Sequence, residues 1–311
     1  MEKNNSITHV PVLFEEIMNI ITPQMDIFLD GTFGYGGHTL GIINQVIKYN
    51  SWNIQDKKRF ATDMDREVFD IWNQTLKENI IDDLQISQNI NNIKNINIYN
   101  IGYQDIFWHN LPKFDFVLLD LGANMHHFKK WDRWFSIKLD WELDMRYDIR
   151  TKLTAKIIIN DRKESKIAEL LVIYGDFTAG MATKITNNIY THRKSKPINT
   201  TSELCAILLE SWLNNTRIAV VFQCIRIAVN DEFGNISKFL DKLDEISHSG
   251  TVVAIITFHS LEDKLVKYKL AEYTDSWSRE TINKHVIKPS FSEIKKNPAS
   301  ASAKLRIIKR K

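Results

Sequence analysis

The residues that could do chemistry begin with the stretch DGTFGYGGHT, Asp30 to Thr39, which holds four of the chain's eleven glycines. Glycine loses more backbone freedom on folding than any other residue, so such a cluster indicates a loop that needs bare backbone. The stretch directly follows the apolar run IFL, which places the loop at the end of an expected strand. A loop of this kind can hold a phosphate, a dinucleotide or another small molecule, or it can be a tight turn.

The spacing of the glycines narrows this choice. A P-loop requires GxxxxGK[ST], and no lysine follows these glycines, so an NTPase is disfavoured. The dinucleotide pattern GxGxxG is fitted by Gly34 and Gly36 but not by Thr39, which leaves a nicotinamide-dependent oxidoreductase as the weaker alternative. A glycine loop after the first strand also suits S-adenosylmethionine, whose amino-acid part and sulfonium lie close to the backbone.

Further apolar runs lie at residues 27–32, 59–65, 96–103, 114–122 and 251–260. Separated by helical segments, such runs predict the parallel strands of a doubly wound α/β sheet. Ligands of these sheets bind beyond the carboxyl ends of the strands. The polar residues expected at those ends are Asp30, Asp63, Tyr103, Asp120 and His259. Asp63 could accept both hydroxyls of a ribose there, and Asp120 could lie near a transferred methyl group.

The spacing of the expected strands breaks between Asp120 and Thr251, where about 130 residues intervene, far more than one crossover helix requires. Residues 164–213 read as several helices, and Thr200 with Glu203 forms a capping box at the start of one of them. These features predict a helical domain that is inserted into the sheet domain.

The predicted boundaries place the inserted helical domain at 131–214 and the sheet domain at 1–130 and 215–311. The boundary between residues 214 and 215 depends on the segment that follows it. Apolar residues recur there every three or four positions, which predicts one long helix from Thr216 to Ile246. That helix is expected to lead the chain back to the sheet.

The composition is that of an ordinary globular protein, with 311 residues of which 43% are hydrophobic and 25% charged. The net charge of +3 is too small to indicate nucleic-acid binding by itself. Basic residues nevertheless gather after Glu293, at Lys295, Lys296, Lys304, Arg306, Lys309, Arg310 and Lys311. This basic tail could contact phosphates, and the alternative interpretation is a solvated terminus.

The chain has two cysteines, Cys205 and Cys224, which excludes a disulfide framework. No metal-ligand spacing such as CxxC occurs, so no metal is expected. The N-terminal stretch MEKNNSITHV lacks the apolar core of a signal peptide, and no apolar run approaches the roughly 18 residues of a membrane helix. We therefore expect a soluble, cytoplasmic protein that does not bind a membrane.

Seven blocks of residues occur in the order of one family: HVPVLFEEI (9–17), DGTFGYGGHT (30–39), LLDLG (118–122), LDMRYD (143–148), FQCIRIAVNDEF (222–233), FHSLEDKLVK (258–267) and NPASASAKLR (297–306). The chain resembles the MraW-like 16S ribosomal RNA (cytosine-N4) methyltransferases, which use S-adenosylmethionine to modify a cytidine at the decoding centre of the small subunit. The resemblance extends from His9 to Arg306 and is most specific in FHSLED, NDE and LDMR.

This resemblance implies a Rossmann-like class I methyltransferase fold, with a mainly parallel sheet and an inserted helical domain that binds RNA. The implied partner is the small ribosomal subunit with its 16S rRNA, and a homodimer is left open. The residues implied to contact S-adenosylmethionine are Gly36, Gly37, His38, Asp63, Tyr103, Asp120 and His127. His38 and the two glycines would lie against the amino-acid part, with Asp120 near the methionine amine. Asp63 would hold the ribose and Tyr103 would flank the adenine, while His127 replaces a glutamine and can still donate a hydrogen bond.

The exocyclic amine of cytosine is a poor nucleophile, because its lone pair is delocalised into the ring. Its methylation needs in-line positioning and an acceptor for the proton that the amine loses. Asn124 and His259 are the candidate catalytic residues, because Asp120 is implied to hold the cofactor. The structural alternatives are a turn residue for Asn124 and a structural hydrogen bond for His259.

A stacked base must leave its stack before this chemistry, and aromatic residues often hold it. Trp134 is the candidate for stacking, although tryptophans more often pack in cores. Arg133 and Arg146 are candidate partners of the substrate RNA, and a structural pair with Asp144 is the alternative for Arg146.

Several positions near the expected substrate site depart from the family pattern. Asn124 and Met125 replace two serines, and Trp134 replaces a glycine. Ala299 and Ala301 replace two arginines. A bulky residue in place of a glycine with positive φ requires a rearranged loop. These departures motivate a second hypothesis, a catalytically weakened RNA-binding descendant of the same family.

Overall fold

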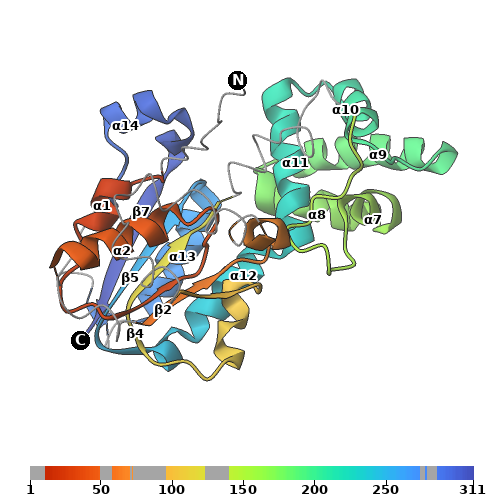
Figure 1. The fold of residues 1–311 in the computed structure, drawn as a ribbon. Helices are drawn as coiled ribbons and strands as arrows, with labels where there is room; N and C mark the ends of the chain where they lie inside the picture. Colours follow the sequence, from red (N-terminus) through yellow and green to blue (C-terminus); the bar gives the residue numbers. More distant parts are fainter. Residues whose placement is uncertain are drawn as a thin grey trace, which may run out of the picture. The chain divides into compact units, whose positions relative to one another are not determined.

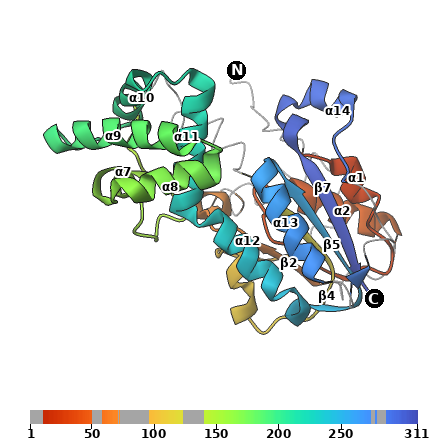
Figure 2. The ribbon, with the colours of Figure 1, turned by 180° about the vertical axis from the view of Figure 1, so that it is seen from behind.

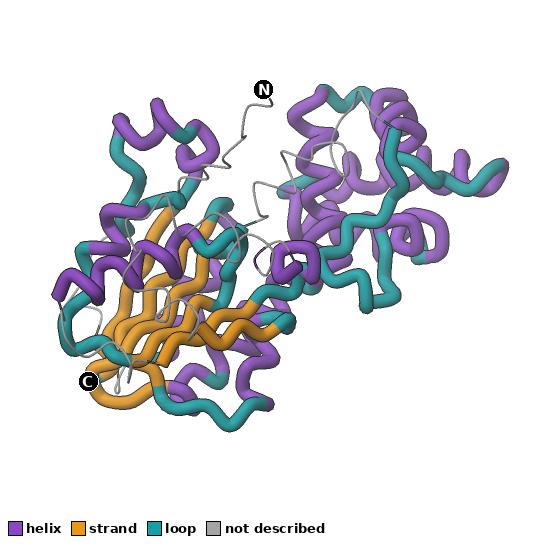
Figure 3. Tube along the Cα trace, in the orientation of Figure 1, coloured by secondary structure: helices purple, strands orange, loops and turns teal. Residues whose placement is uncertain are grey.

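Among the described residues, strands from both ends of the chain form a seven-stranded sheet in the order β3-β2-β1-β4-β5-β7-β6 (Figures 1 and 3). Its strands are β1 (Ile27–Asp30), β2 (Lys58–Thr62), β3 (Ile96–Tyr99), β4 (Phe114–Asp120), β5 (Ser247–Thr257), β6 (Trp277–Ser278) and β7 (Lys304–Arg310). β1 to β5 pair in parallel, and β7 runs antiparallel to β5 and β6. The five predicted strands and the mainly parallel, Rossmann-like sheet are confirmed.

The computed structural model describes residues 11–49, 58–70, 72, 96–122, 140–273, 277–278 and 286–311. The chain divides into two compact units, of which one comprises residues 1–122 and 235–311 and the other residues 123–234. The first contains the sheet. Among the described residues, no helix is both long and apolar enough to cross a membrane.

Two helices, α1 (Phe14–Met18) and α2 (Gly37–Tyr49), cover one face of the sheet (Figure 1). Side chains alternate between the two faces of a strand, so Phe116 and Leu118 of β4 point to the same side. Both are fully buried in a cluster that includes Ile42 of α2. Val117 and Leu119 are also fully buried. Burial on both faces explains why β4 reads as an almost continuous apolar run.

The opposite face of the sheet is covered by α12 (Glu232–Asp241) and α13 (Ser260–Glu272), which Figure 2 shows from behind. Shorter elements complete the unit: η1 (Tyr103–Trp108), η2 (Leu243–Ile246), α14 (Phe291–Lys296) and η3 (Pro298–Ser302). Helices on both faces of a mainly parallel sheet form the doubly wound arrangement that the strand spacing predicts.

The second unit is built from α7 (Ala155–Asp161), α8 (Glu164–Gly175), α9 (Ala179–Ser195), α10 (Thr201–Glu210) and α11 (Asn215–Asn230), which share a core of their own. The predicted capping box of Thr200 and Glu203 is present at the start of α10. The predicted insertion, 131–214, lies within this unit. α11 belongs to it as well, because its buried side chains pack in the same core, so this unit continues past residue 214 to the end of α11.

The single long helix predicted from Thr216 to Ile246 is wrong. The chain forms α11, α12 and η2 there, and α11 ends at Asp231, whose φ of 49° is left-handed. A left-handed residue after the last turn ends a helix. The carboxylate of Asp231 occupies the space where residue 234 would carry a Cβ, which explains the glycine there. Apart from glycine, asparagine and aspartate are the residues that best tolerate a left-handed backbone. The pair Asn230 and Asp231 is therefore the feature of the sequence that indicates the end of the helix.

The strand β7 corrects the interpretation of the basic C-terminal residues as a solvated terminus. Lys304 Nζ lies 3.2 Å and Arg306 Nε 2.6 Å from carboxylate oxygens of Asp263 on α13. Burial alone would raise the pKa of Asp263, but the hydrogen bonds from Arg306 and Lys304 outweigh it and hold this pKa below its ordinary value. Two cations of the tail thus hold β7 against α13.

Asp263→Asn is expected to lower the stability at neutral pH by about 1–3 kcal/mol, because two half-buried cations, Lys304 and Arg306, lose a charged acceptor. The native pKa of Asp263 lies below the ordinary value of 3.8, so its contribution is complete above that pH and is lost as the pH falls through the native pKa. Urea midpoints of the wild type and the variant should therefore converge in acid. Asp70→Asn is the control, since its ion pair with Arg66 is exposed and should contribute little. A difference that persists unchanged in acid would contradict the assignment.

Candidate functional site

The glycine loop leaves β1 at Asp30 and enters α2 at Gly37, at the carboxyl edge of the sheet. Backbone hydrogen bonds hold it there: Gly31 N donates to Leu118 O of β4 at 2.8 Å. Gly34 and Gly36 have φ values of 52° and 75°, which other residues adopt with strain. The loop therefore requires glycine for its own backbone.

Packing beneath the loop also requires glycine. A Cβ on Gly36 would lie 2.9 Å from Cζ3 of Trp72 and 3.0 Å from Cζ of Phe33. A Cβ on Gly37 would lie 2.5 Å from Cγ of Pro11. These contacts lie within the protein, so packing and backbone conformation explain both glycines without reference to a ligand.

Asp30 is a buried positioning residue that the sequence reasoning placed only at a strand end. Its Oδ2 accepts a hydrogen bond from Thr39 Oγ1 at 2.6 Å, and its Oδ1 accepts one from Thr32 N at 3.1 Å. Thr32 Oγ1 in turn accepts a hydrogen bond from Asp120 N at 2.6 Å. Burial raises the pKa of Asp30, against the lowering effect of the Thr39 hydroxyl. This chain of contacts joins β1, the glycine loop, α2 and the end of β4.

His38 and Asp120 come together beside this loop, as the resemblance implies. Nε2 of His38 lies 3.5 Å from Oδ2 of Asp120, and the His38 side chain is 7% exposed. Within the described part of the chain, neither ring nitrogen of His38 has a hydrogen-bond partner, and neither has Oδ1 of Asp120. Buried polar atoms are rarely left unpaired, so this pair can take a ligand that both donates and accepts hydrogen bonds.

Asp63 directly follows β2 and binds the glycine loop from there. Its Oδ2 accepts a hydrogen bond from Gly34 N and its Oδ1 accepts one from Asp65 N, at 2.8 and 2.9 Å. Each carboxylate oxygen has a second lone pair, so these contacts are compatible with acceptance of ribose hydroxyls. Tyr103 is buried, with its ring edge-on to Phe239 at 5.5 Å between centroids. The roles of Asp63 and Tyr103 toward a ribose and an adenine stay predictions.

His38 of α2 and Asp120 of β4, which lie beside the glycine loop, fit the polar end of S-adenosylmethionine. That end carries an ammonium and a carboxylate. An unpaired oxygen of Asp120 can accept from the ammonium, and His38 can donate to the carboxylate. The three strand ends of β1, β2 and β4 thus offer the donors and acceptors that the cofactor requires.

His259 has a structural role at the start of α13. Its Nδ1 accepts a hydrogen bond from Glu262 N at 3.4 Å, while Oε2 of the buried Glu262 accepts from His259 N at 3.4 Å and from Phe258 N at 2.8 Å. This reciprocal arrangement is a capping box with histidine in the place of serine. The structural alternative for His259 therefore has support, and its catalytic role stays a prediction.

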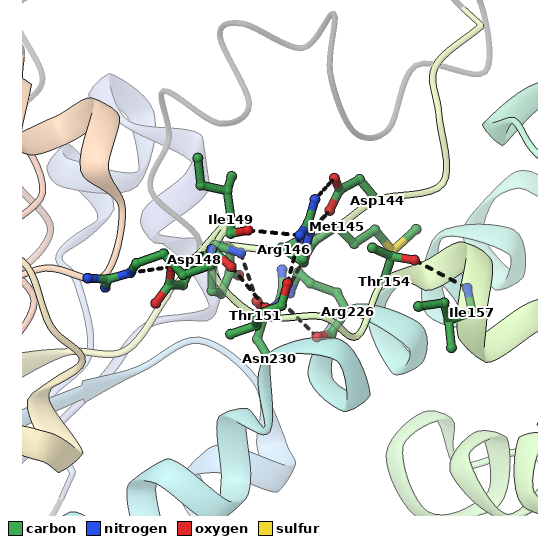
Figure 4. Close-up of polar contacts among 12 residues, drawn as sticks. Asp144, Met145, Arg146, Asp148, Ile149, Thr151, Thr154, Ile157, Arg226 and Asn230 are labelled. Atoms are coloured by element: carbon green, nitrogen blue, oxygen red, sulfur yellow. Dashed lines mark hydrogen bonds and ion pairs between the residues drawn. The ribbon is translucent and has the colours of Figure 1, made fainter.

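Arg146 is held within its own loop, in the helical unit (Figure 4). Nε and Nη2 donate to the two oxygens of Asp144 at 2.6 and 2.7 Å. Nη1 donates to the carbonyls of Ile149 and Thr151 at 2.9 and 2.7 Å. A guanidinium has five N–H donors, and these contacts use four of them. The arrangement supports the structural alternative for Arg146, and contact with RNA stays a prediction.

The NDE block anchors this loop on the end of α11. Asn230 Nδ2 donates to Met145 O, and Asn230 Oδ1 accepts from Tyr147 N, both at 2.8 Å. Glu232 accepts from Nε and Nη2 of Arg226 at 2.8 and 3.2 Å. Met145 has a φ of 64°, and the two contacts of Asn230 fix the backbone directly after it. Sequence reasoning assigned no role to Asn230.

Four of the candidate residues, Asn124, His127, Arg133 and Trp134, lie outside the described residues. The site that the structure describes is therefore the cofactor side, with Gly36, Gly37, His38, Asp63, Tyr103 and Asp120.

Comparison with known proteins gives one consistent answer. A family model described as the MraW methylase family matches residues 6–311. The Ribosomal RNA small subunit methyltransferase H of Wolbachia sp. subsp. Drosophila simulans is 33% identical over 311 residues, which cover 97% of this chain and 99% of that protein. The protein of the same name from Coprothermobacter proteolyticus is 31% identical over 314 residues, covering 98% and 97%. That from Elusimicrobium minutum is 32% identical over 325 residues, covering 98% and 99%.

Proposed function

Because this chain belongs to the MraW methylase family, whose members are S-adenosylmethionine-dependent rRNA methyltransferases, we propose that it methylates the N4 amine of a cytidine in small-subunit rRNA, near the decoding centre. The structural observation that carries the proposal is the pair of His38 and Asp120 beside the glycine loop: both ring nitrogens of His38 and Oδ1 of Asp120 are buried without a hydrogen-bond partner among the described residues. A nicotinamide-dependent oxidoreductase is disfavoured, because Thr39 stands where the dinucleotide pattern GxGxxG requires its third glycine.

The residues on the cofactor side have separate tasks in this proposal. Asp120 and His38 hold the amino-acid part, and the buried Asp30 with its two threonines keeps Asp120 in position. Asp63 holds the ribose, Tyr103 flanks the adenine and His127 donates a further hydrogen bond. S-adenosylmethionine supplies the electrophilic methyl group when it is bound.

On the substrate side, the protein must orient the cytosine amine and accept its proton. We assign this task to Asn124, with His259 as the second candidate. Trp134, Arg133 and Arg146 are proposed to contact the RNA. The inserted helical domain, predicted at 131–214, is proposed to bind the rRNA, and the protein would act in the cytoplasm on the small ribosomal subunit.

Methyl transfer from labelled S-adenosylmethionine to unmodified small subunits, followed by nucleoside analysis, tests the proposal. We expect label in N4-methylcytidine. Cofactor binding without any product would favour the catalytically weakened RNA-binding descendant. Label in another nucleoside would keep the enzyme class and overturn the assignment of the amine, whereas a failure to bind S-adenosylmethionine would overturn the proposed methyltransferase activity.

A further inference from the structure

Trp212 is an exposed tryptophan in a backbone conformation that favours glycine. It follows Ser211, the C-cap of α10, and its φ is 66°. Glycine is the usual residue at this left-handed position, because other side chains are strained there. The Trp212 side chain is 86% exposed, so its burial does not offset this strain within the described part of the chain. A bulky residue that costs stability and gains little from the fold is a candidate for contact with a ligand.

The turn around Trp212 is fixed by its neighbours. Asn188 of α9 donates to Ser211 Oγ at 2.8 Å, and Leu213 on the other side is buried. Nζ of Lys184, one turn before Asn188 on α9, lies 5.8 Å from the centre of the Trp212 ring. The ring and the lysine are therefore presented together, on a turn that the contact between Asn188 and Ser211 holds against α9.

The charges around this turn are distributed unevenly. α9, from Ala179 to Ser195, contains no acidic residue. The two acids of α10 have basic partners, since Glu203 pairs with Lys196 at 2.6 Å and Glu210 with His192 at 2.7 Å. Among the described residues, Lys184 has no carboxylate within salt-bridge distance. The positive charge of Lys184 and the aromatic face of Trp212 are therefore adjacent on this part of the surface.

A second pair of the same kind lies on α9. Nζ of Lys194 is 4.1 Å and Cζ of Arg193 is 5.1 Å from the centre of the Tyr190 ring. The cations of α9 that lack an acidic partner therefore each lie over an aromatic ring. Aromatic rings with adjacent cations are the combination by which proteins bind single-stranded nucleic acid, since bases stack on the rings and the cations meet the phosphates.

We propose that Trp212 and Lys184 form a contact site for a single-stranded segment of rRNA, with a base stacked on the indole and a phosphate at Nζ. This inference rests on the proposed function, because it names the surface by which the helical unit takes its substrate. A protein partner is the less favoured occupant, since lysine is depleted in the cores of protein interfaces. The site lies in the helical unit, so it can be altered without a change in the cofactor residues.

The test uses Trp212→Gly, which removes the ring and supplies the residue that the backbone favours. We expect the full-length variant to keep or raise its Tm and to keep its affinity for S-adenosylmethionine. Its affinity for a fluorescein-labelled single-stranded oligonucleotide and for deproteinised small-subunit rRNA should fall about tenfold, the loss typical of one stacked base. Lys184→Gln should weaken binding and reduce the slope of log K against log salt by about 0.7, as one lost phosphate contact does for single strands.

Leu209→Ala is the matched control, because Leu209 lies one turn earlier on α10 and is 53% exposed but has no π-face. It should bind RNA as the wild type does. The inference is overturned if the wild type binds and methylates rRNA and Trp212→Gly does so equally well. It is also overturned if Trp212→Gly binds naked RNA normally and loses affinity only for complete subunits, which would indicate a protein partner. A wild type that binds no RNA would instead contradict the proposed function.

Discussion

Asp120→Asn is expected to weaken the binding of S-adenosylmethionine about tenfold to a hundredfold. The carboxylate charge is lost, and hydrogen bonds to charged groups contribute about 1.5–3 kcal/mol, with each 1.4 kcal/mol worth a factor of ten. The backbone N–H of residue 120 still donates to Thr32, so the end of β4 should stay in place. Isothermal titration calorimetry of the variant with S-adenosylmethionine measures the change.

Asp115→Asn is the matched control for this experiment, because Asp115 lies on the same strand at its opposite end. Its Oδ2 accepts hydrogen bonds from the backbone of Asp26 and Ile27, and its Oδ1 lies 2.9 Å from Nε2 of His248. Its replacement should lower the Tm and leave the dissociation constant for S-adenosylmethionine unchanged. Equal affinities of the Asp120→Asn variant and the wild type would show that Asp120 does not face the cofactor.

Gly36→Ala is expected to lower the stability by about 1–3 kcal/mol, the usual range for a residue held in a strained conformation. The φ of 75° disfavours any side chain, and the new Cβ would meet Trp72 at 2.9 Å. The loop leads directly into α2, which carries His38. Because relief of this strain must move the loop and with it His38, we also expect measurable methyl transfer to be lost. Thermal melting and a single-turnover methylation assay measure the two effects separately.

Gly180→Ala makes the same chemical change where the structure has room for it. Gly180 lies in α9, and a Cβ there would meet nothing within 4 Å. Alanine is favoured over glycine in helices, so this variant should be more stable by about 0.5–1 kcal/mol and should methylate normally. A Gly36→Ala variant that resembled it in both measurements would contradict the account of the loop.

The sheet was predictable because its central strands are buried on both faces. In β4 this burial makes FDFVLLD almost uniformly apolar, which leaves little doubt from sequence alone. β7 has the opposite character, since Lys304 and Arg306 alternate with buried Leu305 and Ile307. These two cations are satisfied by Asp263, about forty residues earlier in the chain, and no local pattern reveals such a partner. The sequence therefore leaves phosphate contact and a solvated terminus open for these basic residues, and pairing within the fold is the role it does not reveal.

The long helix failed as a prediction for a different reason. Its apolar period continues across Asp231, because α11 and α12 each have a buried face. Only the left-handed backbone of Asp231 interrupts the helix, and the spacing of apolar residues carries no information about φ. A local rule, the tolerance of Asn and Asp for left-handed backbone, is the stronger signal at such a place.

The cofactor side of the candidate site followed from the rule that ligands bind at the carboxyl ends of parallel strands, together with the family resemblance. The rule brings His38 and Asp120 together, as observed. It does not show that Asp144 and two carbonyls engage four of the five donors of Arg146, or that Asp30 supports Asp120 through Thr32. Those facts depend on side-chain contacts, which spacing along the chain does not determine.

The place of β7 within the sheet has a consequence for the nascent chain. Polypeptides are made from the N-terminus, so β5 leaves the ribosome before β7, and about fifty residues separate the two strands. During that interval β5 presents a row of unpaired N–H and C=O groups along one side, a template for pairing with a strand of another molecule. A translational pause between α13 and β7 would therefore favour aggregation, and completion of β7 removes that hazard.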